Sequence, residues 1–188
     1  MLAAGGLADA VEVRYLPANL HNRPERIVPA LRELLAELDP RNERTVLLGY
    51  GDCGTGGGID RLIAERPNLH RIPGDHCYEF YAGSELFHAL QDAEIGTMYL
   101  TDFLAKHFEA LLWQGLGLDR HPELLEAYFG NYTRLVLLSQ TDRADVVEAA
   151  RNAAERLHLR FEQHHVGLAP FAGAVEVVLG ARHDGRVA

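Results

Sequence analysis

Two cysteines are the residues of this chain best suited to chemistry, and each lies in a polar loop just after a predicted strand. Cys53 lies in a glycine-rich segment, and Cys77 follows a proline–glycine turn. Because the carboxyl ends of neighbouring parallel strands lie about 5 Å apart, we expect the two sulfurs to meet at one edge of a sheet. His76 precedes Cys77 directly, and His21 leaves the first predicted strand at the same edge, so either imidazole could join the thiols.

Thiolate and imidazole groups are the preferred protein ligands of zinc and of iron, including iron–sulfur centres. The sequence therefore predicts a zinc or iron site. Its candidate ligands are Cys53, Cys77, His76 and His21. Asp52 and Glu79 are the candidate catalytic residues, because a carboxylate beside a metal can carry a proton or orient a ligating histidine. Two other interpretations stay open: a reactive thiol pair or single nucleophile, and two cysteines that only pack as small apolar side chains.

The segment around Cys53 also permits a binding function without chemistry. Six of the ten residues at positions 49–58 are glycine, and they satisfy the G-x-G-x-x-G pattern between a predicted strand and a predicted helix. Such a loop lets backbone approach a phosphate closely. The alternative function is therefore a nucleotide- or tetrapyrrole-binding module, and a tight turn is the purely structural interpretation. The candidate cofactor-binding residues are Gly51, Gly54, Thr55, Gly56 and Gly57.

Short β-rich runs alternate with helical patterns along the chain, which is typical of an α/β protein. We predict a Rossmann-like parallel sheet flanked by helices, in one domain over residues 1–188. The strands are expected at residues 11–15, 45–49, 69–72, 134–139 and 159–166. The helices are expected from Pro24 to about Leu38 and at residues 59–65, 85–93 (capped by Ser84), 102–114 (capped by Thr101), 121–129 (closed by a left-handed Gly130) and 142–157.

Residues 46–52 can be aligned with residues 136–142, and in both places a helix and a short strand are predicted next. This similarity suggests two related βαβ halves with a ligand cleft between them. Residues 2–7 resemble the end of a helix with its glycine cap, which predicts that an N-terminal element is missing. The tail after about residue 180 is expected to be flexible.

The composition of the chain argues against several classes of function and partner. The 188 residues carry a formal charge of −9, which argues against nucleic acid as the main partner, because phosphate backbones need a basic surface. No run of about eighteen apolar residues predicts a membrane span, and the first residues do not form a secretory signal. With only two cysteines, neither in a disulfide framework, we expect a cytoplasmic protein with no membrane partner.

Five motifs occur in order along most of the chain. They are Leu20–Pro24 (LHNRP), Gly51–Gly57 (GDCGTGG), His76–Phe80 (HCYEF), Tyr99–Phe103 (YLTDF) and Tyr128–Tyr132 (YFGNY). Together they resemble an uncharacterised bacterial and archaeal domain-of-unknown-function family whose genes are often found with those of corrinoid-dependent methyltransferases. The resemblance implies a metal-binding accessory protein or small metal-dependent enzyme linked to corrinoid-dependent methyl and one-carbon metabolism.

Corrinoid methyltransferase components are the partners that the resemblance implies. Relatives usually begin with a strand and a Cys-Gly-Ala-Leu motif ahead of the region that matches Leu2 onward, and this motif is absent here. If that cysteine is a third ligand in relatives, the metal site of this chain is incomplete. A missing first element would also make partner exchange, and hence an oligomer, plausible.

Overall fold

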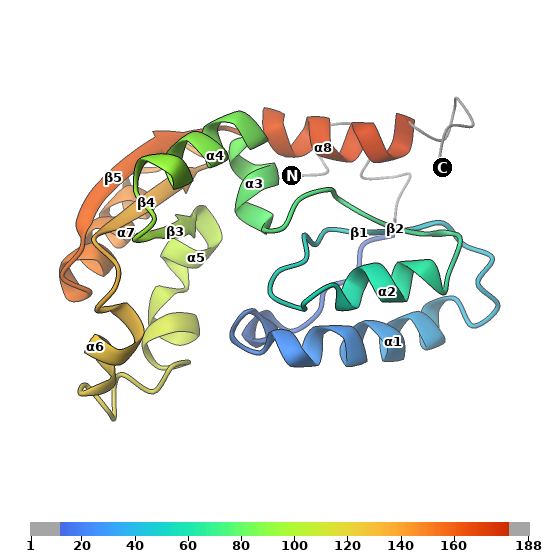
Figure 1. Cartoon of the computed structure of the whole chain (residues 1–188), viewed down its shortest axis with the longest axis horizontal. Helices are drawn as coiled ribbons and strands as arrows, with labels where there is room; N and C mark the ends of the chain where they lie inside the picture. Colours follow the sequence, from blue (N-terminus) through green and yellow to red (C-terminus); the bar gives the residue numbers. More distant parts are fainter. Residues whose placement is uncertain (1–11, 181–188) are drawn as a thin grey trace. The chain divides into compact units, whose positions relative to one another are not determined.

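The computed structural model describes residues 12–180, and the chain divides into two compact units (Figure 1). Among the described residues, the first unit comprises residues 12–80 and 168–180, and the second comprises residues 81–167. Each unit contains parallel strands flanked by helices. The predicted α/β class with parallel sheets is therefore confirmed. The predictions for residues 2–7 and for the tail after residue 180 lie outside the described residues.

The first unit contains a two-stranded parallel sheet in which Val46 lies opposite Leu69. Its elements are η2 (Ala18–Asn22), η3 (Pro24–Arg26), α1 (Ile27–Leu38), β1 (Val46–Leu48), α2 (Gly58–Ala64), β2 (Leu69–Arg71), α8 (Ala169–Gly180) and α3 (Cys77–Ala82), whose last two residues belong to the second unit. Helices α3 and α8 meet through Phe80 and Phe171, whose ring centroids lie 5.9 Å apart.

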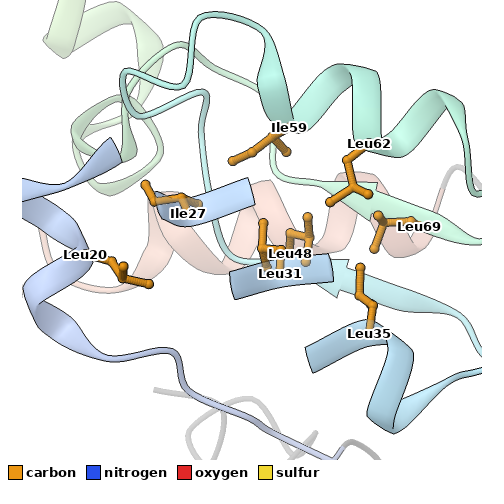
Figure 2. Close-up of a cluster of buried hydrophobic side chains, with 8 residues drawn as sticks. All are labelled: Leu20, Ile27, Leu31, Leu35, Leu48, Ile59, Leu62 and Leu69. Carbon is orange, nitrogen blue, oxygen red and sulfur yellow. The ribbon is translucent and has the colours of Figure 1, made fainter. Parts of the chain in front are cut away.

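Helix α1 supplies one side of the core of the first unit. Its buried residues Ile27, Leu31 and Leu35 recur every four positions, so they lie on one helical face. Pro29 lies in the first turn, where its missing N–H removes no helical bond. Figure 2 shows the core side chains gathered between the helices and the strands; they are Leu20, Ile27, Leu31, Leu35, Leu48, Ile59, Leu62 and Leu69.

The second unit is built on a three-stranded parallel sheet in the order β3-β4-β5. Strand β4 is central, and all six of its residues are buried. Helices α5 and α7 contact each other and the sheet. The elements are α4 (Ser84–Ala93), β3 (Thr97–Thr101), α5 (Asp102–Lys106), the π-helical turn η4 (Glu109–Trp113), α6 (Leu124–Phe129), β4 (Arg134–Ser139), α7 (Ala144–Arg156) and β5 (Arg160–His165).

Several predicted elements need correction. Residues 12–15 of the predicted first strand form no strand; Glu12 instead pairs with Arg14 and Arg44. The predicted helix 102–114 is broken into α5 and η4, although the Thr101 side chain caps its start as predicted. Gly130 follows α6 in right-handed geometry, with φ −60°, so the predicted left-handed cap is wrong.

Four elements were not predicted: η2, β3, α3 and α8. The similarity between residues 46–52 and 136–142 falls on equivalent units of structure, because β1-α2-β2 and β4-α7-β5 are both parallel βαβ crossovers, one in each compact unit. Within residues 12–180, no helix combines the length and apolar character needed to cross a membrane.

Candidate functional site: a thiol pair

The loops that follow β1 and β2 are joined through their backbones. The Asp52 N–H donates to the Gly74 carbonyl at 3.2 Å, and the Cys53 N–H donates to the Asp75 carbonyl at 2.9 Å. These bonds continue the pairing of β1 and β2 beyond the ends of the two strands. They place the residues on either side of Cys53 against the residues that lead to Cys77.

Glycine at position 51 makes this close approach possible. A Cβ built on Gly51 would lie 3.0 Å from both the Gly74 carbonyl oxygen and the His76 carbonyl carbon. Both contacts are with backbone, which cannot move aside as a flexible side chain can. Cys53 itself has a left-handed backbone, with φ 50°, a conformation that costs most residues other than glycine some free energy. The backbone conformation of the loop is thus constrained at Gly51 and at Cys53 itself.

Cys53 and Cys77 are both free thiols, and their side chains share a hydrogen bond. That bond, reinforced by the backbone N–H groups of Cys77 and Gly51, lowers the pKa of Cys53 to about 7, against the opposing effects of burial and of the Asp52 charge. The same hydrogen bond, together with burial and the Cys53 charge, raises the pKa of Cys77 well above its usual value. At neutral pH the pair therefore combines a partly ionised Cys53 with a protonated Cys77.

The carboxylate of Asp52 fixes the glycine-rich loop from inside. It accepts hydrogen bonds from the Thr55 hydroxyl at 2.6 Å, from the Gly57 N–H at 2.8 Å and from the Gly56 N–H at 3.1 Å. Burial alone would raise the pKa of Asp52, but these bonds and the nearby charge of Arg71 lower it. The contacts give Asp52 a positioning role, because they hold the turn that carries Cys53.

A family model described as "Protein of unknown function (DUF1638)" matches residues 15–174. This chain belongs to the DUF1638 family. The matched region contains both cysteines and nearly all of the described structure. No curated protein and no solved structure matches the chain.

Two residues of the candidate site in this DUF1638 protein were missed in the sequence. Arg71, the last residue of β2, donates to the carbonyls of Ile72 and Gly74 at 3.0 and 2.8 Å and forms a bidentate pair with Asp60 of α2. It therefore holds the loop that precedes Cys77. An arginine two residues before the proline–glycine turn was the available signal.

Tyr50 is the second residue that was missed. Burial raises the pKa of Tyr50, and so do the charges of Cys53 and Cys77, which places the phenol beside the thiol pair. Tyr50 also packs against the core of the first unit. Its position within the glycine-rich segment was the signal that could have identified it.

The predicted histidines do not complete a metal-binding cluster with the thiols. Among residues 12–180, no group of three or more His, Cys, Asp or Glu side chains is placed to hold a metal ion. His76 is exposed, and desolvation by surrounding protein atoms lowers the pKa of His21. The carboxylate of Glu79 accepts from the Asp75 N–H at 3.2 Å, so it helps to fold the loop before Cys77. The structure thus brings together Cys53 and Cys77 of the four candidate ligands.

The candidate cofactor-binding glycines lie beside a small pocket. Its volume is about 260 Å³, and its lining residues are Pro24, Glu25, Val28, Arg32, Thr55, Gly58, Arg61 and Glu65. Pro24 of the LHNRP motif lies 3.5 Å from a Cβ built at Gly54, so this motif and the glycine-rich loop are neighbours. Because Asp52 already occupies the N–H groups of Gly56 and Gly57, these donors are not directed at a ligand.

Proposed function

We propose that this DUF1638 protein is a metal-binding accessory protein or small metal-dependent enzyme in which Cys53 and Cys77 are thiolate ligands. The observation that carries the proposal is the hydrogen-bonded thiol pair, with the pKa of Cys53 lowered to about 7. Metal ligands must be deprotonated, so a thiol that ionises near neutral pH binds metal with little competition from protons.

Zinc or iron is the proposed metal, because both accept thiolate ligands, and iron–sulfur centres are held by thiolates. Two protein thiolates leave further coordination positions for small molecules or for ligands such as His21 and His76 after local movement. Open positions are typical of metal sites that act on a substrate rather than only stabilise a fold. Glu79 is the proposed proton carrier, and Asp52 acts by holding the loop of Cys53.

The metabolic setting of the proposal comes from the family resemblance. We propose a cytoplasmic role in corrinoid-dependent methyl and one-carbon metabolism, with corrinoid methyltransferase components as partners. The alternative is a nucleotide- or tetrapyrrole-binding module that uses the pocket beside the glycine-rich loop. It ranks second because the pocket volume of about 260 Å³ falls below the roughly 300–1,000 Å³ usual for ligand sites, and because Asp52 occupies the loop donors.

The test is metal binding by protein that is purified anaerobically and kept reduced. Zinc and ferrous iron should each be titrated into the chelator-treated wild type, C53S, C77S and the control H88A, which removes an exposed histidine of α4. We expect wild type and H88A to bind equally, and each cysteine variant to bind more than about tenfold more weakly, with fewer protons released on binding. Equal affinity in all four proteins would show that the thiols are not ligands.

A further inference from the structure

We propose that the pocket lined by η3, α1 and α2 binds a small zwitterion, an aliphatic amino acid whose carboxylate pairs with Arg61 and whose ammonium group pairs with Glu25. The pocket has a volume of about 260 Å³, and all of its lining residues belong to the first unit. It is separate from the proposed metal site, because neither cysteine lines it. The proposed ligand also differs from a nucleotide or tetrapyrrole, which needs a larger cavity.

Contacts between α1 and α2 hold the walls of the pocket in place. Arg32 of α1 donates two hydrogen bonds to the carboxylate of Glu65 in α2, both at 2.6 Å. Gly58 begins α2, and a Cβ built on it would lie 3.0 Å from the Cγ2 atom of Val28 in α1, so the two helices approach each other closely there. All four residues line the pocket. Its walls are therefore formed by the packing of the first unit and do not depend on a ligand.

The charges that line the pocket decide the class of ligand. Arg32 and Glu65 already satisfy each other. Within residues 12–180, Arg61 donates only to the Gly56 carbonyl, at 3.1 Å, and Glu25 forms no hydrogen bond or ion pair. A guanidinium has several N–H donors, so Arg61 keeps donors that a ligand can use. One positive and one negative group thus line the same pocket without pairing with each other.

A zwitterion suits this arrangement better than a ligand with a single charge. An anion would pair with Arg61 but would be repelled by Glu25, and a cation would meet the reverse situation. A ligand with both charges forms a charge-assisted hydrogen bond at each group. Its ammonium group should carry N–H donors for Glu25, because quaternary ammonium groups are bound by aromatic side chains and none of the lining residues is aromatic.

The remaining lining residues favour a short aliphatic chain between the two charged groups. Pro24 and Val28 provide apolar contacts. The Thr55 hydroxyl donates to the Asp52 carboxylate at 2.6 Å, so it is not free to donate to a polar chain. The volume of about 260 Å³ lies below the roughly 300–1,000 Å³ of sites for drug-sized ligands. A small aliphatic amino acid therefore matches the pocket in charge, polarity and size.

The experiment is calorimetric titration of the full chain at neutral pH and low salt, because salt screens exposed charges such as those of Glu25 and Arg61. The probes are L-valine and 4-aminobutanoate, whose two charges lie at a short and at a longer separation. Butanoate and butylamine are the controls with a single charge. We expect at least one zwitterion to bind, and both single-charge compounds to bind at least about tenfold more weakly, because each leaves one charged group of the pocket unpaired.

E25Q and R61Q should each weaken binding of the zwitterion by about tenfold or more. The matched controls E33Q and R41Q replace exposed residues outside the lining and should bind as the wild type does. The unfolding midpoint of each variant establishes that it is folded. Absence of binding by both zwitterions, equal binding of the single-charge compounds, or unchanged affinity in E25Q and R61Q would overturn the proposal. The protein is treated with chelator first, so the outcome does not depend on the proposed metal site.

Discussion

The carboxyl edges of the two parallel sheets differ in the chemistry of the residues that follow their strands. In the second unit, the polar groups after β3 and β4 bind one another. The carboxylate of Asp102 accepts from the Gln140 N–H at 2.9 Å and from the Thr141 hydroxyl at 2.6 Å, and the Gln140 side chain accepts from the Asp102 N–H at 3.0 Å. This edge of the sheet is closed by its own hydrogen bonds.

In the first unit, the loop after β1 also satisfies its polar backbone, because Asp52 binds the glycine N–H groups. What remains is a pair of thiols whose hydrogen bond is to each other. The comparison shows that the end of a strand becomes a candidate site when it carries side chains that are not needed to stabilise the loop. The same kind of sheet edge is therefore closed by its own hydrogen bonds in one unit and carries the candidate site in the other.

Ser139, His165 and Asp142 at the end of the second sheet superficially suggest a hydrolase triad. Ser139 is fully buried, and the same nitrogen, Nδ1 of His165, lies 3.4 Å from the serine hydroxyl and 3.1 Å from the Asp142 carboxylate. A catalytic relay uses the two ring nitrogens for the two partners. The cluster is therefore structural, which agrees with a closed edge in the second unit.

The largest expected effect tests the difference between the two sheets. Leu137 is fully buried in the centre of β4, whereas Leu47 of β1 is only partly buried. We expect L137A to lower the free energy of unfolding by about 3–4 kcal/mol and L47A by about 1–2 kcal/mol. Urea unfolding measures both. Equal losses would mean that the two sheets contribute alike to stability.

Asp52 provides the next test, because it stabilises the loop of the first unit. D52A removes three hydrogen bonds to a charged acceptor and should lower the free energy of unfolding by about 2 kcal/mol. The pKa of Asp52 is lowered in the folded protein, so its stabilisation is present above the unfolded value of about 3.9 and is lost as the pH falls through the folded value. The difference between wild type and D52A should therefore shrink in acid, and the exposed control D92A should show little difference at any pH.

Gly51 and Gly49 form a matched pair that tests the contact between the two loops. A Cβ at Gly51 meets the backbone of the second loop at 3.0 Å, and a Cβ at Gly49 meets nothing within 4 Å. We expect G51A to cost about 1–2 kcal/mol of stability and to raise the pKa of Cys53 by moving Cys77 away. G49A should leave the Cys53 alkylation rate unchanged. Identical alkylation rates in the two variants would show that the interaction of Cys53 with Cys77 does not depend on the close approach of the two loops.

The smallest expected effect is a shift in pH dependence. The rate of Cys53 alkylation by iodoacetamide in C77A should reach half its maximum at a higher pH than in the wild type, because alanine removes the side-chain hydrogen bond that lowers the Cys53 pKa to about 7. A free cysteine has a pKa of about 8.5. Rates measured from pH 5 to 9.5 give both midpoints, and coincident midpoints would show that Cys77 does not stabilise the thiolate.

The elements of the fold could be predicted where the local sequence carried one clear pattern of apolar and turn residues. Strand β4 was predicted at residues 134–139, because an apolar run between turn residues favours a buried parallel strand. Strand β3 was missed because it runs directly into α5, so Thr101 was recognised only as a helix cap. Helix α8 was missed because Pro170 and Gly173 favour a loop, although Pro170 falls in the first turn, where proline is tolerated.

The candidate site was predictable only where it depends on strand order. Cys53 and Cys77 were expected to meet because each follows one of two successive parallel strands. The partners that tune them depend on tertiary contacts: Arg71 holds its loop through Asp60 of α2, and Tyr50 lies next to the thiols as a result of core packing. The hydrogen bonds from Asp52 to its own loop could not be predicted either. An aspartate in a turn can bind a ligand or stabilise the turn itself, and the sequence does not distinguish these two roles.

The left-handed backbone of Cys53 bears on the evolution of the loop. Glycine or asparagine adopts that conformation more easily. A mutation of Cys53 to either residue would therefore relieve backbone strain and stabilise the folded protein. We expect a cysteine without a function at this position to be replaced by glycine or asparagine during evolution. In a sequence survey of the family, cysteine at this position should therefore disappear together with its counterpart after β2, whereas the surrounding glycines should outlast both.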